Sequence, residues 1–111
     1  MKNEEKCIFC QIIEGKEEAN VRYDDDRFLV FDDINPSAPE HVLIVPREHI
    51  EDMSQVDEEV LCEMIELAKK ISNDWQLDHF RVQINNGRKA GQIVDHLHMH
   101  LLGWNKGKEV A

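Results

Sequence analysis

Apolar and polar residues form several short runs along the chain, each bounded by acidic, proline or glycine residues. Val21–Tyr23, Phe28–Phe31 and His41–Val45 have the β-branched and aromatic residues that are typical of strands. The acidic triplet 24–26 predicts a turn between the first two strands, and two prolines within residues 35–39 predict a loop before the third. We therefore expect three strands in the first half of the chain.

Two other stretches have the spacing of helices. Ile8–Glu14 predicts a short helix that ends at Gly15, and a longer stretch runs from Asp57, a candidate N-cap, to about Trp75. The apolar residues of the longer stretch share one helical face and indicate core packing: Val60, Leu61, Met64, Ile65, Ala68, Ile71 and Trp75. Cys62 in this stretch is expected to be a small buried apolar residue.

The second half of the chain predicts two further strands. Phe80, Val82 and Ile84 alternate with polar residues, as in a strand that has one buried face. A glycine-containing loop over residues 85–91 follows, and Val94–Leu102 predicts the last strand. Strands gathered around one long helix predict an α+β domain with an antiparallel sheet of about five strands.

The size and charge of the chain narrow its possible partners. We expect one domain over residues 1–111. We expect it to be cytoplasmic, because residues 1–6 do not begin a signal peptide and no run of ~18 apolar residues could span a membrane. A chain this short also gains core by pairing, so we expect a homodimer. The net charge of −10 argues against nucleic acid and anionic membranes as partners. It is compatible with a small anionic ligand in a locally favourable pocket.

Three histidines alternate with apolar residues near the end of the chain. In an extended strand His96, His98 and His100 lie on one face, while Leu97 and Met99 point toward the core. An exposed strand face usually mixes Thr, Lys and Glu, so three imidazoles favour metal ligation or phosphorus chemistry. Imidazole is a good nucleophile toward phosphorus, and it can act as acid or base near neutral pH.

The loop before these histidines has features of an anion site. Gly87 and Gly91 allow backbone N–H groups to approach a phosphate closely, and Asn85 adds a neutral donor. At the other end of the chain, Cys7 and Cys10 form a C-x-x-C pair. Such a pair indicates zinc or a redox dithiol, and the redox interpretation lacks the preceding strand that it requires.

Together these segments resemble the histidine triad (HIT) family. Residues 96–102 match its H-x-H-x-H motif followed by two apolar residues, and residues 41–49 match its H-x-L-φ-φ-P-x-x-H segment. Further likenesses lie in residues 7–10, 31–36 and 85–92, so that the resemblance extends over about residues 7–104. It is greatest to small bacterial nucleoside phosphoramidases and adenosine-phosphate hydrolases. The resemblance implies a HIT-like fold whose sheet continues across a homodimer.

The resemblance also implies roles for the residues around the phosphate. His98 would be the nucleophile and would form a nucleotidyl-histidine that water resolves, and His100 and His41 would help with proton transfer. Asn85 and the backbone around Gly91 and Gln92 would hold the phosphate. These roles describe a hydrolase that acts at the α-phosphorus of a nucleotide.

The remaining substrate residues would bind the nucleoside, an AMP-like purine nucleotide. Asp33 would accept hydrogen bonds from the ribose hydroxyls. A set of apolar residues would sandwich the purine, with plain core packing as the alternative: Ile8, Phe9, Ile12, Phe31 and Ile34.

The resemblance implies that the C-x-x-C pair binds a metal ion. In family members that carry the pair, zinc is held by two cysteines and two histidines, which here are Cys7, Cys10, His49 and His96. Four such ligands make a closed tetrahedral site, and therefore a structural one. A pair of buried thiols without metal is the alternative.

One departure from the family pattern leaves alternatives open. Ile93 stands where many phosphoramidases of this branch have a serine near the scissile bond, which puts efficient phosphoramidate cleavage in doubt. A nucleotidyltransferase is one alternative, although related transferases carry Gln where this chain has His100. A purine-nucleotide-binding module without catalysis is another.

Overall fold

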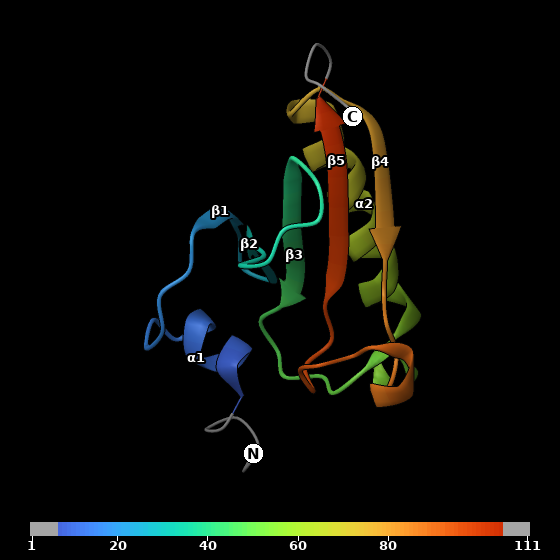
Figure 1. Cartoon of the computed structure of the whole chain (residues 1–111). Coiled ribbons are helices and arrows are strands. Elements are labelled where there is room, and N and C mark those ends of the chain that lie inside the picture. The colour runs from blue at the N-terminus through green and yellow to red at the C-terminus, as the bar shows by residue number, and fades with distance from the viewer. Residues whose placement is uncertain (1–6, 106–111) are drawn as a thin grey trace.

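The computed structural model describes residues 7–105 and contains one five-stranded antiparallel sheet of order β1-β2-β3-β5-β4 (Figure 1). The elements are α1 (Ile8–Ile13), β1 (Val21–Asp24), β2 (Phe28–Asp32), β3 (Glu40–Pro46), α2 (Glu58–Asp74), β4 (Leu77–Gln83) and β5 (Met99–Asn105). Two 3-10 turns, Met53–Gln55 and Arg88–Ala90, lie in the connections. The predicted α+β class, with about five strands, one long helix and one short helix, is confirmed. No helix within the described range is long and apolar enough to cross a membrane.

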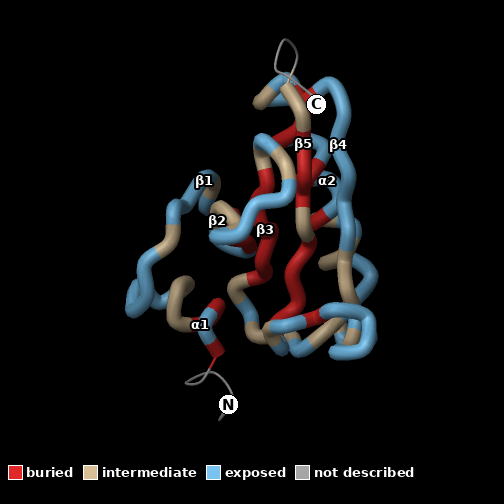
Figure 2. Tube along the Cα trace, viewed as in Figure 1, coloured by how far each residue is buried: buried red, intermediate tan, exposed pale blue. Residues whose placement is uncertain are grey.

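The long helix α2 covers one face of the sheet. Its buried residues Met64, Ala68 and Ile71 belong to one core cluster with Val42 and Leu101 of the central strands. Figure 2 shows the buried stretches of β3 and β5. Cross-strand neighbours on this face are almost fully excluded from water, which is the main source of stability for a domain of this size.

Three expectations about α2 are corrected. Asp57 is its N-cap residue, but its side chain makes no capping hydrogen bond. Cys62 is exposed rather than buried, because at 3.6 residues per turn it lies about 160° around the helix from Met64. Ile65 is 43% exposed, whereas Leu67, which was not in the predicted stripe, is buried.

The opposite face of the sheet is only half covered. The short helix α1 places Phe9 and Cys10 on Leu29, Phe31 and Leu43 of strands β2 and β3. In the view of Figure 1, α1 lies on the side of β1–β3, away from β4 and β5. The histidine-bearing strand therefore faces an opening rather than a second helix.

The last two strands differ from their predicted bounds. The predicted strand Val94–Leu102 was wrong in its first half, because β5 begins only at Met99. Before that point the backbone bonds elsewhere, with the Leu97 N–H donating to the Ile50 carbonyl at 2.7 Å. Leu97 is nevertheless buried beside Met99 in the core under α2, so the apolar and histidine positions still alternate.

Strand β4 is the edge of the sheet next to β5. It spans Leu77–Gln83 rather than the predicted Phe80–Ile84. Its predicted apolar face is only partly covered, since Phe80 is 46% and Val82 37% exposed. Both lie on the α2 side of the sheet, because Val82 is paired with the buried Leu101.

Candidate functional site

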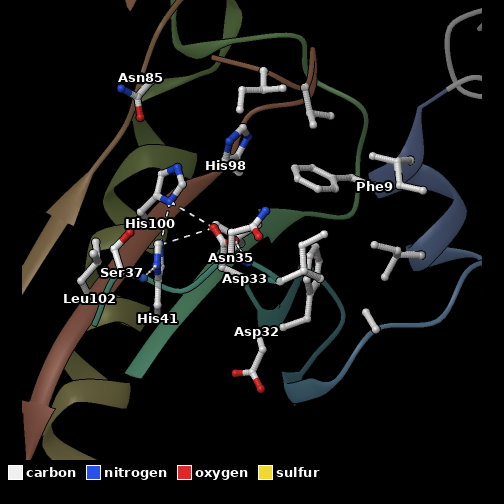
Figure 3. Close-up of a pocket in the computed structure, with 18 of the residues that line it drawn as sticks. Phe9, Asp32, Asp33, Asn35, Ser37, His41, Asn85, His98, His100 and Leu102 are labelled. Carbon is white, nitrogen blue, oxygen red and sulfur yellow. Dashed lines mark hydrogen bonds and ion pairs between the residues drawn. The ribbon is translucent and has the colours of Figure 1, made fainter. Parts of the chain in front are cut away.

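A cavity of about 730 Å³ opens on the half-covered face of the sheet (Figure 3). This volume is typical of pockets for small organic ligands. Apolar residues of α1 and β2 line one end of it, three histidines line the middle, and residues of β4 with Leu102 of β5 line the other end. The predicted catalytic and substrate-binding residues that line it are Ile8, Phe9, Ile12, Phe31, Asp33, Ile34, His41, Asn85, Gly91, His98 and His100.

His98 has one ring nitrogen fixed by the backbone. Its Nδ1 lies 2.8 Å from the carbonyl oxygen of His96, so Nδ1 carries the proton and donates, and Nε2 keeps its lone pair. Burial lowers the pKa of His98, and the bond to this carbonyl and the charge of Asp33 only partly oppose the effect. The Phe9 ring packs edge-on against the imidazole at a centroid distance of 5.1 Å. His98 is therefore a neutral, oriented imidazole, which is the form a nucleophile needs.

His41 and His100 form a hydrogen-bonded pair beside His98 (Figure 3). The Ser37 N–H donates to His41 Nδ1 at 2.9 Å, so the proton of neutral His41 is on Nε2. This Nε2 lies 3.0 Å from His100 Nδ1 and donates to it, which leaves the proton of His100 on its own Nε2. Two successive bonds thus orient an N–H of His100, in a ring that lines the cavity.

The charge near this pair comes from Asp33. Its Oδ2 lies 3.4 Å from His41 Nε2 and 3.8 Å from His100 Nδ1, while its Oδ1 accepts from the Asn35 N–H at 2.8 Å. Burial lowers the pKa of His100 to about 4, and the neighbouring His98 and His41 lower it further against the opposing charge of Asp33. His100 is therefore neutral in the free protein at pH 7.

The loop before the histidines is held in shape by two amide side chains. Asn85 Nδ2 donates to the Ala90 carbonyl at 2.7 Å. Gly91 has φ of +99°, and a Cβ there would lie 3.3 Å from Asn85 Nδ2, so this position favours glycine. Gln92 is 4% exposed and bonds the Gly87 N–H and the Glu51 carbonyl. Among the predicted phosphate residues, Asn85 and Gly91 line the cavity, whereas the side chain of Gln92 braces the loop from inside.

The apolar end of the cavity is built from α1 and β2. Phe9 and Phe31 meet edge to face at 5.5 Å, and both are buried. Ile34 is 91% exposed and stands at the rim. Ile93 is also exposed, at 78%, and lines both this cavity and a smaller one beside Cys7. The cavity therefore has an apolar floor at one end and two exposed isoleucines at its edges.

The four predicted metal ligands also come together. Cys7 Sγ and Cys10 Sγ lie 3.4 and 3.5 Å from His96 Nδ1, and Cys10 Sγ lies 3.2 Å from His49 Nδ1. A tetrahedral zinc ion with ordinary bond lengths would separate sulfur and nitrogen ligands by about 3.6 Å. His96 Nε2 lies 2.9 Å from the Pro46 carbonyl and donates to it, which leaves Nδ1 free to ligate. The four residues therefore fit a zinc ion in spacing, and His96 fits it in protonation as well.

The ring of His96 is fully buried. Burial lowers its pKa to about 4, against the raising effect of the bond to Pro46. A neutral imidazole is the form that binds a metal. His96 thus belongs to the cysteine cluster, while His98 and His100 belong to the cavity, so the three histidines of the motif serve two different sites.

Some cavity residues were not predicted. Ser37 acts through its backbone N–H, which no side-chain motif reveals. Arg81 and Gln83 of β4 also line the cavity, together with Leu102 of β5. The alternation in β4 contains the signal for two of them, because a strand whose even-numbered residues face α2 must turn its odd-numbered residues to the opposite face.

Comparison with known proteins agrees with this geometry. The HIT domain family matches residues 14–107. A HIT-like protein of Methanocaldococcus jannaschii is 40% identical over 99 residues, which are 86% of this chain and 77% of that protein. A HIT-like protein of Synechocystis sp. is 41% identical over 103 residues, which are 89% of this chain and 90% of that protein.

Solved structures of the same family are also similar. A HIT family hydrolase from Clostridium thermocellum has 38% identity and a TM-score of 0.84, covering 96% of this chain and 98% of that one. A zinc-bound histidine triad protein from Mycobacterium smegmatis has 28% identity and a TM-score of 0.85, covering 97% and 81%. A hypothetical histidine triad nucleotide-binding protein from Sulfolobus tokodaii has 33% identity and a TM-score of 0.81, covering 92% of this chain and 71% of that one. The chain belongs to the HIT, or histidine triad, family.

Proposed function

We propose that this protein is a nucleotide hydrolase that cleaves at the α-phosphorus of purine nucleoside phosphoramidates or related nucleotides. The proposal depends on one observation. His98 Nδ1 donates a hydrogen bond of 2.8 Å to the His96 carbonyl, within a cavity large enough for a nucleotide. The similar HIT family hydrolase from Clostridium thermocellum supports hydrolysis, and the similar hypothetical nucleotide-binding protein from Sulfolobus tokodaii supports a nucleotide as the ligand.

In the first step, His98 Nε2 attacks the α-phosphorus and forms a phosphorus–nitrogen bond. The bond from phosphorus to the leaving amine breaks, and the amine keeps the electron pair. The leaving nitrogen takes a proton from His100 Nε2. This proton is one that the hydrogen-bonded His41–His100 pair gains from solvent when the negatively charged phosphate binds, so both rings are neutral after the step. The products of this step are a free amine and a nucleotidyl-histidine.

In the second step, water attacks the phosphorus of the intermediate and releases His98. The water proton returns to the His41–His100 pair, and the product is a nucleoside 5′-monophosphate. Asn85 holds a phosphate oxygen with the amide N–H that its bond to the Ala90 carbonyl leaves over, and Asp33 accepts from the ribose hydroxyls. The backbone N–H groups of Ala90, Gly91 and Gln92 already donate to carbonyls within the loop. The purine lies among the apolar residues at the α1 end of the cavity.

We also propose that the cysteine cluster holds a structural zinc ion. Four protein ligands would close the coordination shell, so the ion would stabilise the fold and take no part in the reaction. The cluster would join α1, through Cys7 and Cys10, to the segment that carries His96. The zinc-bound relative from Mycobacterium smegmatis supports this assignment.

The exposed edge of the sheet supports a homodimer. Strand β4 has a partner on one side only, and it presents the half-exposed Phe80 and Val82 next to its free edge. We propose that β4 pairs with β4 of a second copy and so continues the sheet. Light scattering should give a mass near twice the chain mass of 13.0 kDa. A monomeric mass at assay concentration would contradict the dimer.

The hydrolase proposal is tested with adenosine 5′-phosphoramidate and the variant His98→Ala. We expect the wild type to release AMP and ammonia, and the variant to lose turnover by at least about a thousandfold while it still binds AMP. His79→Ala is the matched control, since His79 is exposed and lies outside both histidine sites. Equal activity of His98→Ala and the wild type would overturn the assignment of the nucleophile.

The exposed Ile93 favours one alternative function, a nucleotide-binding module without catalysis. A wild-type protein that binds AMP and turns over none of a panel of phosphoramidates and dinucleotides would establish that alternative. A transferase would instead pass the nucleotidyl group to added inorganic phosphate or a second nucleotide, and product analysis by chromatography distinguishes this from hydrolysis.

A further inference from the structure

Arg81 differs from the other arginines of this acidic chain, because no carboxylate of the described residues forms an ion pair with it. All five arginines lie within residues 7–105, and four of them form ion pairs with carboxylates. These pairs are Arg22 with Asp32 and Glu40, Arg27 with Glu63, Arg47 with Asp24, and Arg88 with Asp95. Arg81 has no ion pair or hydrogen bond with any described residue, and it lines the cavity that contains His98. With 23 acidic side chains in the chain, an arginine without an acidic partner is notable.

The register of the sheet places Arg81 beyond the histidines. In the pairing of β4 with β5, Gln83 lies opposite His100, and Arg81 lies opposite Leu102. Leu102 is two residues, or about 6.8 Å, further along β5 than His100, on the same face of the sheet. Figure 3 shows Phe9 and Leu102 on opposite sides of His98 and His100. Arg81 is therefore on the side of the histidines away from the proposed base site.

The charges that line the cavity are unevenly distributed. Its carboxylates, those of Glu17, Glu18, Asp32 and Asp33, come from the segment after α1 and from the end of β2. Arg81 is the single lysine or arginine among the described residues that line it. An anionic group on a bound ligand would thus be repelled from the acidic side and attracted to the β4 side. A guanidinium can also hold a carboxylate or a phosphate with two parallel hydrogen bonds.

We propose that Arg81 binds an anionic group on the leaving group of the substrate. The inference rests on the proposed hydrolase, in which the nucleoside occupies the α1 end and His98 attacks the phosphorus. The leaving group then departs past His100 toward β4, where Arg81 is the available cation. The substrate class becomes nucleotides whose leaving group itself carries negative charge, as a carboxylate or a further phosphate. Arg81 is a specificity residue, and the bonds that form and break are those of the hydrolysis above.

A matched pair of substrates tests this role. AMP joined through its phosphorus to the nitrogen of glycine carries a carboxylate, and AMP joined to glycinamide has the same size without that charge. We expect the wild type to prefer the glycine compound in kcat/KM by about tenfold or more, the size of a charge-assisted hydrogen bond. Arg81→Met should remove most of this preference, and Arg81→Lys should restore part of it. An unchanged preference in Arg81→Met would overturn the proposal.

Two further measurements fix the interpretation. Arg27→Met is the matched control, because Arg27 is paired with Glu63 and does not line the cavity. It should keep the wild-type preference, and a similar loss there would overturn the specific role of Arg81. ADP serves as the third substrate, with a phosphate in place of the carboxylate. ADP loses its leaving group by P–O cleavage rather than P–N cleavage, so the readout is the effect of Arg81→Met on each substrate. A larger loss of kcat/KM for ADP assigns the site to phosphate, and a larger loss for the glycine compound assigns it to carboxylate.

Binding measurements separate this inference from the hydrolase proposal. In the His98→Ala background, calorimetry should show that Arg81→Met weakens ADP binding about tenfold more than AMP binding. If that difference is seen without wild-type turnover, the hydrolase fails and the anion site stands. If the glycinamide compound is hydrolysed and Arg81→Met changes neither preference nor ADP binding, the anion site fails and the hydrolase stands.

Discussion

Two clusters of potential metal ligands lie on the same face of the sheet, and they differ in the hydrogen bond that fixes the proton position on one histidine of each. The first contains Cys7, Cys10, His49 and His96, and the second contains Asp33, His41 and His100. Within each cluster the ligand atoms lie within 4.8 Å of one another. Proximity alone therefore does not distinguish a metal site from a proton-transfer site.

The difference lies in the backbone group behind each histidine ring. His96 Nε2 faces the Pro46 carbonyl and must donate to it, so Nδ1 has a lone pair for a metal. His41 Nδ1 faces the Ser37 N–H and must accept from it, so Nε2 carries a proton and donates to His100. A histidine that donates one N–H to a carbonyl keeps a lone pair on its other nitrogen, which can bind a metal. A histidine that accepts an amide N–H on one nitrogen carries its proton on the other, which can donate it.

Loss of a cysteine ligand should have the largest effect on the first cluster. We expect Cys10→Ser to reduce zinc content well below one ion per chain and to lower Tm by at least about 10 °C, because ion binding contributes to folding. Elemental analysis and a thermal scan measure the two effects. Cys62→Ser is the matched control, since Cys62 is exposed on α2. Full zinc occupancy in Cys10→Ser would contradict the assignment.

A substitution in the second cluster should lower the reaction rate and leave the zinc content unchanged. His100→Gln removes the ring that would protonate the leaving group, and we expect kcat for a phosphoramidate to fall by about 10²- to 10³-fold. Zinc content and Tm should stay near those of the wild type, because His100 contacts no member of the cysteine cluster. A loss of zinc together with the loss of rate would show that the two clusters are not separate.

The Ser37 N–H offers the most direct way to alter the protonation of His41. Ser37→Pro removes this donor and frees His41 to place its proton on either nitrogen, so we expect kcat to fall by about tenfold. Ser37→Ala keeps the N–H and should stay within about twofold of the wild type. Single-turnover kinetics measure the step concerned. Equal losses in both variants would show that the hydroxyl, not the N–H, is the important group.

Ile93 lies between the two clusters and should give the smallest effect. Ile93→Ser adds a hydroxyl near the proposed scissile bond, and we expect kcat/KM for phosphoramidates to rise a few-fold. The 78% exposure of Ile93 means that little core packing is lost. Ile93→Ala removes the side chain without adding a donor and serves as the control. A rise of the same size in Ile93→Ala would attribute the effect to space rather than to a hydrogen bond.

Much of this architecture could be predicted from the sequence, because it follows from the types of the side chains and their spacing. The alternation around His98 and the apolar spacing of α2 predicted the two faces of the sheet. The late start of β5 at Met99 could not be predicted, since it depends on the Leu97 N–H bonding the Ile50 carbonyl far away in the sequence. Cys62 was placed wrongly because small apolar residues also occur on exposed helix faces.

In the candidate site, too, some features could be predicted from the sequence and others could not. Motif residues such as His98, Asn85 and Asp33 lie in the cavity, where the resemblance predicted a common site. The Ser37 N–H and the Pro46 carbonyl assign the proton positions, and backbone groups leave no signature in a motif. Arg81 stands out only when the ion pairs of every other arginine are known, which requires the folded chain.

The six residues of α1 support both sites at once. Cys10 belongs to the cysteine cluster, while Phe9 packs on His98 and forms part of the apolar end of the cavity. A helix of this length has no stability of its own in water, so its position depends on what anchors it. Nucleotide affinity should therefore track the state of the two thiols, and an oxidant or chelator that never enters the cavity would act as an inhibitor of binding.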